Sequence, residues 1–338
     1  MVRLLASQKV SLCLFSIALA SAWTVAQAQV PAGVSRPASV PEGFQPTPMG
    51  YFHPSCVKIV AKGDVLHSDE LAIYHQDGSI DAMPACAYPH YTAAGELVST
   101  ELAKDAQSNE PPTIGHSWMV AVQAYTKTSF GKITTEFKVP KAPSSHDGQI
   151  IYLFPGMQEY PEVKQETIIQ PVLGWNTPSQ YFKGGPNVWS ITSWNCCTNG
   201  TLYVSPGERV NTGDTIYGEV VNQCSAGTLE CGKWTIYTED KSNGAWTKLS
   251  NESNFGQTFN WVFGNVLEVY NVKKCSDYPE GGKLEATDVS VYNDKFQKLS
   301  MDAPFWYTSL PAGKNASPQC GYGAYLDTAT GSSMTITY

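Results

Sequence analysis

Short apolar runs, in which apolar and polar residues often alternate, recur along most of the chain. Examples are "KITTEFKV", "DTIYGEVV", "KWTIYTED", "TDVSVYN" and "MTITY", and Gly-rich turn sequences such as "NTGD", "SNGAW" and "PEGGK" separate them. Alternation with a period of two, in segments rich in Val, Ile, Thr and Tyr, is typical of half-buried strands. The pattern predicts an all-β sandwich or barrel.

The alternating segments concentrate in the second two thirds of the chain. We predict that residues 117–338 form one two-layer antiparallel β-sandwich, with "GKITTEFKV" and the C-terminal "SSMTITY" as strands in it. Residues 29–116 are expected to be an N-terminal accessory or pro-segment. The polar, Pro-containing stretch "DAQSNEPPTIG" near its end resembles an exposed cleavage site. We expect this segment to pack over or beside the sandwich and to cover its groove.

Residues 1–28 have the features of a secretory signal peptide. A basic start (Arg3, Lys9) precedes an apolar stretch and the small-x-small site Ala26-Gln27-Ala28, which predicts cleavage before Gln29. The apolar stretch is too short to span a bilayer. The sequence therefore predicts a secreted protein, extracellular or periplasmic.

Charge and cysteine content support an exported protein. Removal of residues 1–28 takes away two basic residues and no acidic one, which leaves 20 basic and 30 acidic residues, a net charge of −10. This balance disfavours nucleic acid and anionic membranes as partners. Eight cysteines remain, an even number that indicates disulfides rather than metal binding. We expect Cys56–Cys86 and Cys224–Cys231 pairs, and separate partners for Cys196 and Cys197.

The positions of the histidines restrict which catalytic groups the predicted sandwich can contain. All six histidines precede residue 147, and residues 149–338 contain none. A Ser-His-Asp or Cys-His site within this region is therefore excluded, unless the N-terminal part lends a base, and so is a His-rich zinc site. We predict no metal and no cofactor. Catalysis here would have to use carboxylates, amides or tyrosines.

Two polar residues interrupt strongly apolar predicted strands. Gln170 lies in "ETIIQPVLGW" and Glu268 in "NVLEVYNV". Because side chains alternate along a strand, Gln170 shares a face with Ile168 and Val172, and Glu268 shares one with Val266 and Tyr270. A buried carboxylate can act as general base on a water molecule, and an amide NH₂ can stabilise the oxyanion that forms at a carbonyl. If the two strands are neighbours, the Gln170 amide would donate to Glu268.

Structural roles are the alternative for each of these residues. Gln170 could be a buried amide that ties strands together, and Glu268 could pair with Lys273, Lys183 or a tyrosine hydroxyl. Residues expected to contact substrate are Gln158, Trp175, Trp189, Trp194 and Tyr270, although tryptophans in a sandwich often belong to its core. Both alternatives remain open at this point.

The order of motifs from about Gly131 to Tyr292 resembles the glutamic peptidases, the eqolisin group of secreted fungal enzymes. The motifs run "GKITTEFKVP", "GQIIYLFPGMQ", "ETIIQPVLGW", "VWSITSW", "NTGDTIYGEV" and "NVLEVY". The resemblance implies a bent β-sandwich of jelly-roll or concanavalin type, with Gln170 at the catalytic Gln and Glu268 at the catalytic Glu on its concave face. The plant neprosin-type peptidases are similar, with Glu in place of Gln170 and with an N-terminal activation segment.

Several positions depart from the family pattern. Phe154 stands where the family has Trp, Gln158 where it has Asp, Pro171 where it has Thr, and Val269 where it has Trp. The motifs "FPG-x-Q", "QPVL-x-W" and "LEVY" resemble more closely a set of uncharacterised secreted proteins.

These observations predict a monomeric, secreted, acid-type endopeptidase that acts on polypeptides, in which Glu268 activates water and Gln170 stabilises the oxyanion. The alternative is a jelly-roll protein that binds or modifies polysaccharides without peptidase activity. A glycosidase needs two carboxylates at a set separation, and the sequence offers one strong carboxylate candidate and an amide.

Overall fold

The fold is described from a computed structural model, which describes residues 36–98, 118–160, 167–178, 183, 185–302, 305–310, 318 and 320–338. The predicted signal peptide, its cleavage site and the polar stretch before residue 117 lie outside these residues. The described elements are strands and three short 3₁₀ helices: η1 (Pro54–Cys56), η2 (Thr198–Gly200) and η3 (Cys275–Asp277). Within this part of the chain, no helix is long and apolar enough to cross a membrane.

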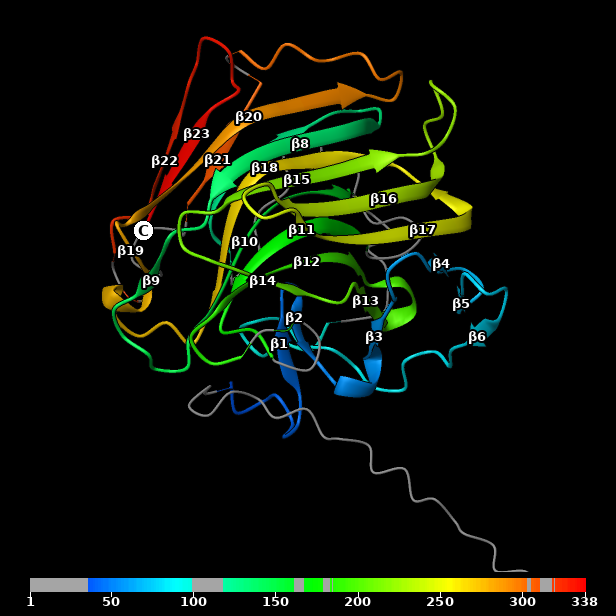
Figure 1. Cartoon of the computed structure of the whole chain (residues 1–338), viewed down its shortest axis with the longest axis horizontal. Helices are drawn as coiled ribbons and strands as arrows, with labels where there is room; N and C mark the ends of the chain where they lie inside the picture. Colours follow the sequence, from blue (N-terminus) through cyan, green and yellow to red (C-terminus); the bar gives the residue numbers. More distant parts are fainter. Residues whose placement is uncertain are drawn as a thin grey trace, which may run out of the picture.

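Two large sheets form the molecule, as Figure 1 shows. The nine-stranded sheet, called the site sheet below, has the order β21–β7–β18–β10–β11–β12–β13–β3, with β14 also paired to β12. Its strands are β3 (Val57–Ile59), β7 (Trp118–Tyr125), β10 (Ile150–Glu159), β11 (Ile168–Trp175), β12 (Trp189–Cys196), β13 (Leu202–Val204), β14 (Glu208–Val210), β18 (Phe259–Tyr270) and β21 (Tyr307–Ser309).

The ten-stranded sheet, called the outer sheet below, has the order β22–β23–β20–β8–β15–β16–β17–β4–β5–β6. Its strands are β4 (Val65–His67), β5 (Ala72–Tyr74), β6 (Ile80–Ala82), β8 (Phe130–Lys138), β15 (Thr215–Asn222), β16 (Cys231–Asp240), β17 (Ala245–Gln257), β20 (Lys283–Asn293), β22 (Gly323–Leu326) and β23 (Met334–Thr337). Two pairs stand apart from both sheets: β1 (Gln45–Thr47) with β2 (Gly50–Phe52), and β9 (Lys141–Pro143) with β19 (Pro279–Glu280).

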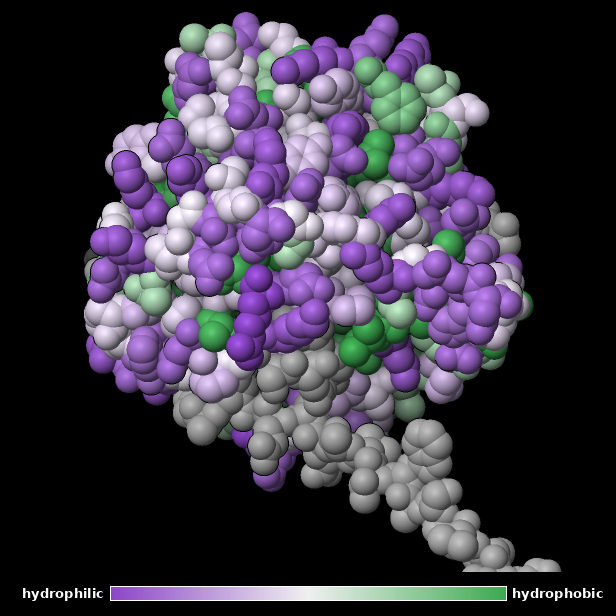
Figure 2. Space-filling view, in the orientation of Figure 1, coloured by the Kyte–Doolittle hydropathy of each residue, from purple (hydrophilic) through white to green (hydrophobic). Residues whose placement is uncertain are grey.

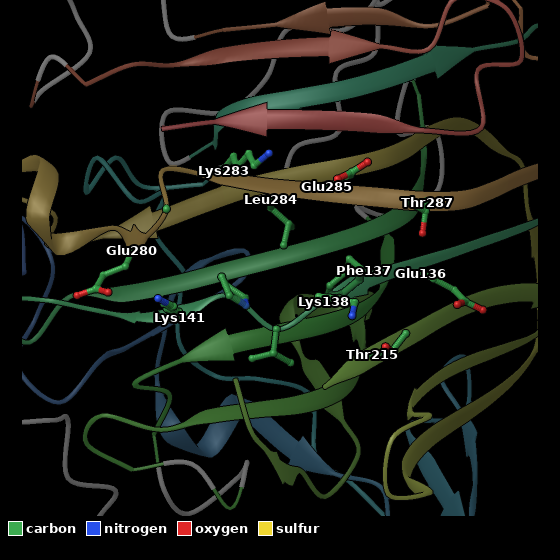
Figure 3. A pocket seen from close by; sticks show the side chains of 13 residues that line it. Glu136, Phe137, Lys138, Lys141, Thr215, Glu280, Lys283, Leu284, Glu285 and Thr287 are labelled. Carbon is green, nitrogen blue, oxygen red and sulfur yellow. The ribbon is translucent and has the colours of Figure 1, made fainter. Parts of the chain in front are cut away.

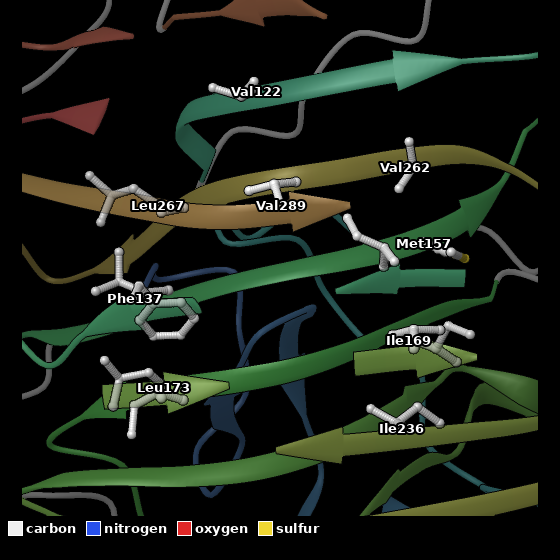
Figure 4. Close-up of a cluster of buried hydrophobic side chains, with 14 of the residues drawn as sticks. Val122, Phe137, Met157, Ile169, Leu173, Ile236, Val262, Leu267 and Val289 are labelled. Atoms are coloured by element: carbon white, nitrogen blue, oxygen red, sulfur yellow. The ribbon is translucent and has the colours of Figure 1, made fainter. Parts of the chain in front are cut away.

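A two-layer β-sandwich is confirmed. "GKITTEFKV" contributes β8 and the C-terminal "SSMTITY" contributes β23, and the described strand pairings within residues 118–338 are all antiparallel. Alternation explains the layers, because every second side chain of a strand faces the other sheet. The inward rows meet in one large apolar cluster, part of which Figure 4 shows, with Ile169 and Leu173 from the site sheet and Phe137 and Ile236 from the outer sheet.

The other face of the site sheet carries a second apolar cluster. Tyr152, Phe154, Trp194 and Val266 belong to it, and so do buried residues of the N-terminal segment, among them Tyr51. The face of the molecule that Figure 2 shows is mainly hydrophilic, and apolar residues form small separate patches on it. The residues that make up both large apolar clusters are buried.

The N-terminal segment adds strands to both sheets. β3 pairs in parallel with β13 of the site sheet, and β4 pairs in parallel with β17 of the outer sheet. Leu66 of β4 is fully buried in the core between the sheets. Full burial of a leucine side chain is typically worth about 1.5–3 kcal/mol. Residues 57–74 are thus built into the sandwich that residues 118–338 form.

Four disulfides cross-link the chain. Cys56–Cys86 and Cys224–Cys231 are confirmed, and Cys275 pairs with Cys320. The prediction for Cys196 and Cys197 is wrong, because these adjacent residues are joined to each other. The other six cysteines that the structure describes pair among themselves, so among these residues each of the two has its neighbour as partner. Disulfides in this number are typical of exported proteins.

Candidate functional site

Glu268 lies on β18 and is fully buried in the second apolar cluster. Its neighbours on this face of the strand are Val266 and Tyr270, as the alternation predicts. The Tyr270 hydroxyl donates to Glu268 Oε1 at 2.7 Å. A hydrogen bond of this kind lowers the free-energy cost of burying a polar group. Of the structural partners considered from the sequence, the structure supplies the tyrosine hydroxyl.

Gln170 lies on β11, and its side chain is also fully buried. Trp194 of β12 is its register partner on one side, and Gly156 of β10 lies against it on the other. A Cβ at Gly156 would come within 3.2 Å of Gln170 Cγ and 2.8 Å of the Ile169 carbonyl oxygen. The glycine in "FPGMQ" therefore gives the amide side chain its room above β10.

The Gln170 amide is unusual because neither its oxygen nor its nitrogen has a hydrogen-bond partner among the described residues. A buried polar group that makes no hydrogen bond typically costs about 1–3 kcal/mol. A glutamine that tied strands together would make such bonds. Among the described residues, the strand-tying role that was the alternative for Gln170 is therefore not seen.

Gln170 and Glu268 share one face of the site sheet, but their strands are not neighbours. β10 runs between them, so the expected direct contact between adjacent strands is absent. Glu268 lies opposite Tyr152 and Gln170 opposite Gly156, four residues further along β10. The two backbone positions are therefore about 13 Å apart along the strands and about 10 Å apart across them. Phe154 occupies the intervening position on β10, and its ring packs edge-on against Trp118.

The other predicted contact residues divide between the two faces. Trp194 and Tyr270 belong to the same cluster as Tyr152, and Gln158 follows Gly156 on that face of β10. Trp175 and Trp189 lie on the opposite face, within the core between the sheets, where their rings are 5.2 Å apart. The structure therefore does not bring these two tryptophans together with Gln170 and Glu268.

A hairpin of the N-terminal segment lies against the carboxylate. It consists of β1 and β2, residues 45–52, at the bottom of Figure 1. The main-chain N–H of Gly50 donates to the Tyr270 hydroxyl at 2.8 Å, and the Tyr152 hydroxyl donates to the main-chain oxygen of Pro46 at 3.1 Å. The ring of Tyr51 meets that of Tyr270 edge-on at 5.4 Å. Two buried tyrosines beside Glu268 thus hold the main chain of a polypeptide segment.

Tyr152 and this hairpin were not identified from the sequence. Tyr152 lies in "QIIYLF", in the same row as Ile150 and Phe154. Gln170 and Glu268 were identified because each carries a polar group within an otherwise apolar row of side chains. Tyr152 has the same feature. Burial raises the pKa of Tyr152 well above its ordinary value, and the nearby Glu268 charge raises it further, so its hydroxyl stays protonated.

A cavity of about 670 Å³ lies elsewhere, where β20 separates from β8 in the outer sheet (Figure 3). Buried Phe137 and Leu284 line it together with charged residues such as Lys141 and Glu280. None of the predicted site residues lines it. Among the described residues, no group of three His, Cys, Asp or Glu side chains could hold a metal ion.

Asp240 is another buried carboxylate, but it lies in the row of β16 that contains Trp234 and Ile236 and faces the core. Desolvation raises its pKa, the Asp214 carboxyl group raises it further, and a hydrogen bond from the Ser242 N–H lowers it. The folded state therefore favours protonated Asp240. This contribution to stability is present below the unfolded pKa and is lost as the pH rises through the folded pKa.

Asp240→Asn is expected to remove this pH dependence and to make the protein more stable than wild type at neutral pH. The measurement is the free energy of unfolding, determined by urea unfolding of both proteins between pH 3 and 8. The control is Asp327→Asn, because a hydrogen bond from Thr330 lowers the pKa of Asp327, so its contribution to stability is lost as the pH falls. Identical pH profiles for wild type and Asp240→Asn would contradict the prediction.

No protein-family model and no curated protein matches the chain. Solved structures with a similar fold include scytalido-glutamic peptidase with a transition state analog inhibitor, at 15% identity and a TM-score of 0.43, and the same peptidase with a peptide-based transition state analog, at 15% and 0.41. A third is SCP-B, a member of the eqolisin family of peptidases, in a complex with the tripeptide Ala-Ile-His, at 16% and 0.41. Each match covers 66% of this chain and 98% of the other.

Proposed function

We propose that the protein is a secreted endopeptidase whose general base is Glu268. The observation that carries the proposal is the hairpin at the carboxylate. Tyr270 accepts a main-chain N–H from Gly50, and Tyr152 donates to a main-chain carbonyl at Pro46, on either side of one hairpin turn. A site that binds the peptide backbone in this way beside a buried carboxylate suits an extended polypeptide substrate.

Hydrolysis requires a base, an oxyanion stabiliser and a proton for the leaving amine. Ionised Glu268 takes a proton from water as the water attacks the carbonyl carbon, and the Gln170 NH₂ donates to the oxygen that becomes negative. Because the two backbone positions lie about 13 Å apart along the strands and about 10 Å apart across them, the proposal requires both side chains to move toward one bound peptide group when the hairpin leaves. Because the base must be ionised and must later return a proton, we expect activity at acidic to mildly acidic pH.

The N-terminal hairpin has the role of an inhibitor in this proposal. It occupies the main-chain binding groups of the site, so substrate binds only when the hairpin leaves. Residues 57–74 pair with both sheets, so they stay with the enzyme whereas the hairpin is displaced. The disulfides suit a protein that works outside the cell. We propose that it acts there as a monomer on a polypeptide.

The test uses the full chain carrying Gly50→Ala, a substitution that displaces the hairpin because a Cβ at Gly50 would come within 2.1 Å of the Tyr91 carbonyl oxygen. We expect this chain to cleave denatured protein at pH 3 to 7, and Glu268→Gln in the same chain to lower the rate by at least ~10²-fold. Equal rates with and without Glu268→Gln would show that the base is elsewhere. Retention on polysaccharide columns without any cleavage would favour the carbohydrate-binding alternative.

A further inference from the structure

The Tyr270 hydroxyl joins the Glu268 carboxylate to a peptide nitrogen. It lies 2.7 Å from Glu268 Oε1 and 2.8 Å from the nitrogen of Gly50. Its side chain is 2% exposed, and the rings of Tyr51 and Tyr152 pack edge-on against it at 5.4 and 6.1 Å. This packing fixes the hydroxyl between the two groups.

The direction of these hydrogen bonds follows from the chemistry of the groups. A tyrosine hydroxyl has one proton to donate and can accept through its oxygen. The main-chain N–H can only donate, so the hydroxyl accepts from Gly50 and gives its own proton to Glu268. The nitrogen of the Met49–Gly50 peptide bond is therefore two hydrogen bonds away from the carboxylate.

We propose that Tyr270 is the catalytic acid that protonates the leaving amine, and that Glu268 reprotonates it. This inference rests on the proposed peptidase function and takes the Gly50 nitrogen as marking the place of the scissile nitrogen. Water attacks the carbonyl carbon and Glu268 takes its proton. The C–N bond then breaks as the Tyr270 proton moves to nitrogen and the Glu268 proton moves to the Tyr270 oxygen. The products are a carboxylic acid and an amine, with Glu268 ionised and Tyr270 protonated as at the start.

In this proposal, the Gly50 N–H of the hairpin stands where the scissile N–H of a bound substrate lies before water attacks. A planar amide nitrogen donates its proton to Tyr270, as Gly50 does. Attack on the carbonyl removes the amide resonance, and the nitrogen becomes pyramidal with a basic lone pair. The lone pair can then accept the Tyr270 proton at the place where the N–H previously donated to the Tyr270 oxygen. The same hydroxyl therefore binds the substrate nitrogen before the attack and protonates it afterwards.

The surroundings of Tyr270 favour a relay over a free tyrosinate. Burial raises its pKa well above the ordinary value, and the charge of Glu268 and the hydrogen bond to it raise it further. A tyrosinate beside the carboxylate would be very unfavourable. Tyr270 therefore gives up its proton only as it receives the one held by Glu268, and the two transfers occur together.

Tyr270→Phe isolates the hydroxyl because the ring and its edge-on contacts are kept. The test compares two substrates with the same acyl group, a peptide amide and a 4-nitrophenyl ester, on the full chain carrying Gly50→Ala. An amine needs a proton to leave, whereas 4-nitrophenolate does not. We expect Tyr270→Phe to lower kcat for the amide by ~10²–10⁴-fold and kcat for the ester by less than about tenfold.

The other variants keep this result interpretable. Glu268→Gln should lower both rates, because both substrates need the attacking water. Tyr278→Phe is the matched control: Tyr278 is equally buried and hydrogen-bonded to Tyr322, but it lies in the core between the sheets, so both rates should be unchanged. Equal losses on amide and ester in Tyr270→Phe, or no loss, would overturn the proton relay alone. If the chain with Tyr270 intact hydrolyses neither substrate, the proposed function fails and the relay with it.

Discussion

Gln170→Met should make the protein more stable, and in the chain that also carries Gly50→Ala it should strongly slow hydrolysis. The Gln170 amide is fully buried without a hydrogen-bond partner among the described residues, and methionine has a similar shape without the polar groups. Removal of an unpaired buried amide should raise the free energy of unfolding by about 1–3 kcal/mol. Loss of an oxyanion donor should lower kcat by ~10²–10³-fold.

Gln149→Met is the matched control for this change. Gln149 is also fully buried, but its amide accepts from the Asp147 N–H and donates to the main-chain oxygens of Ser145 and Asp277. The same substitution should therefore destabilise the fold by about 1–3 kcal/mol, since it leaves main-chain groups without their partner. Urea unfolding of the two variants measures both changes. If Gln170→Met also destabilises the protein and hydrolysis is unchanged, Gln170 is a structural amide.

Gly50→Ala should turn an inactive full-length chain into an active one. Gly50 has a φ of +106°, which alanine rarely adopts, and its Cβ would meet the main-chain oxygen of Tyr91 at 2.1 Å. That oxygen accepts from the Tyr51 N–H, so the collision falls on the contact that holds β2 in place. Backbone strain of this kind costs about 1–3 kcal/mol, so it should raise the fraction of chains with an open site by ~5–150-fold. The collision with the Tyr91 oxygen should raise this fraction further.

The measurement is the initial rate of peptide hydrolysis by full-length protein, with gel electrophoresis to show that the chain is uncut. Gly43→Ala is the control, because Gly43 has a similar φ of +89° but lies outside the hairpin and has no atom within 4 Å of the added Cβ. It should leave the chain inactive. A folded Gly50→Ala protein that is as inactive as wild type would show that the hairpin does not close the site.

Much of the fold followed from local patterns. The alternating runs around Ile133 and Ile336 predicted strands correctly, because each residue's face is set by the two-residue period of the strand itself. The same period placed Glu268 with Tyr270, and Gln170 with Val172, on one face each. The wrong prediction for Cys196 and Cys197 has a different origin, since it depended on where six other cysteines lie in space.

Contacts between distant segments could not be predicted in this way. The sequence does not show that β10 separates the strands of Gln170 and Glu268, or that Trp175 and Trp189 face the core. Both tryptophans alternate correctly along their strands. Which of the two faces is covered by the other sheet depends on pairings between residues far apart in the chain.

The sequence by itself determined that this chain folds as strands, that a carboxylate and an amide interrupt two apolar rows, and that residues 149–338 offer no histidine for catalysis. These properties are local or compositional, so they can be read without knowing which strands pair. Only the tertiary structure decided that Tyr270 and Tyr152 hold the hairpin of residues 45–52 at Glu268. Gly50 and Tyr270 are 220 positions apart. Their contact arises because the outer face of the site sheet is apolar and must be covered, and the N-terminal segment is the part of the chain that covers it.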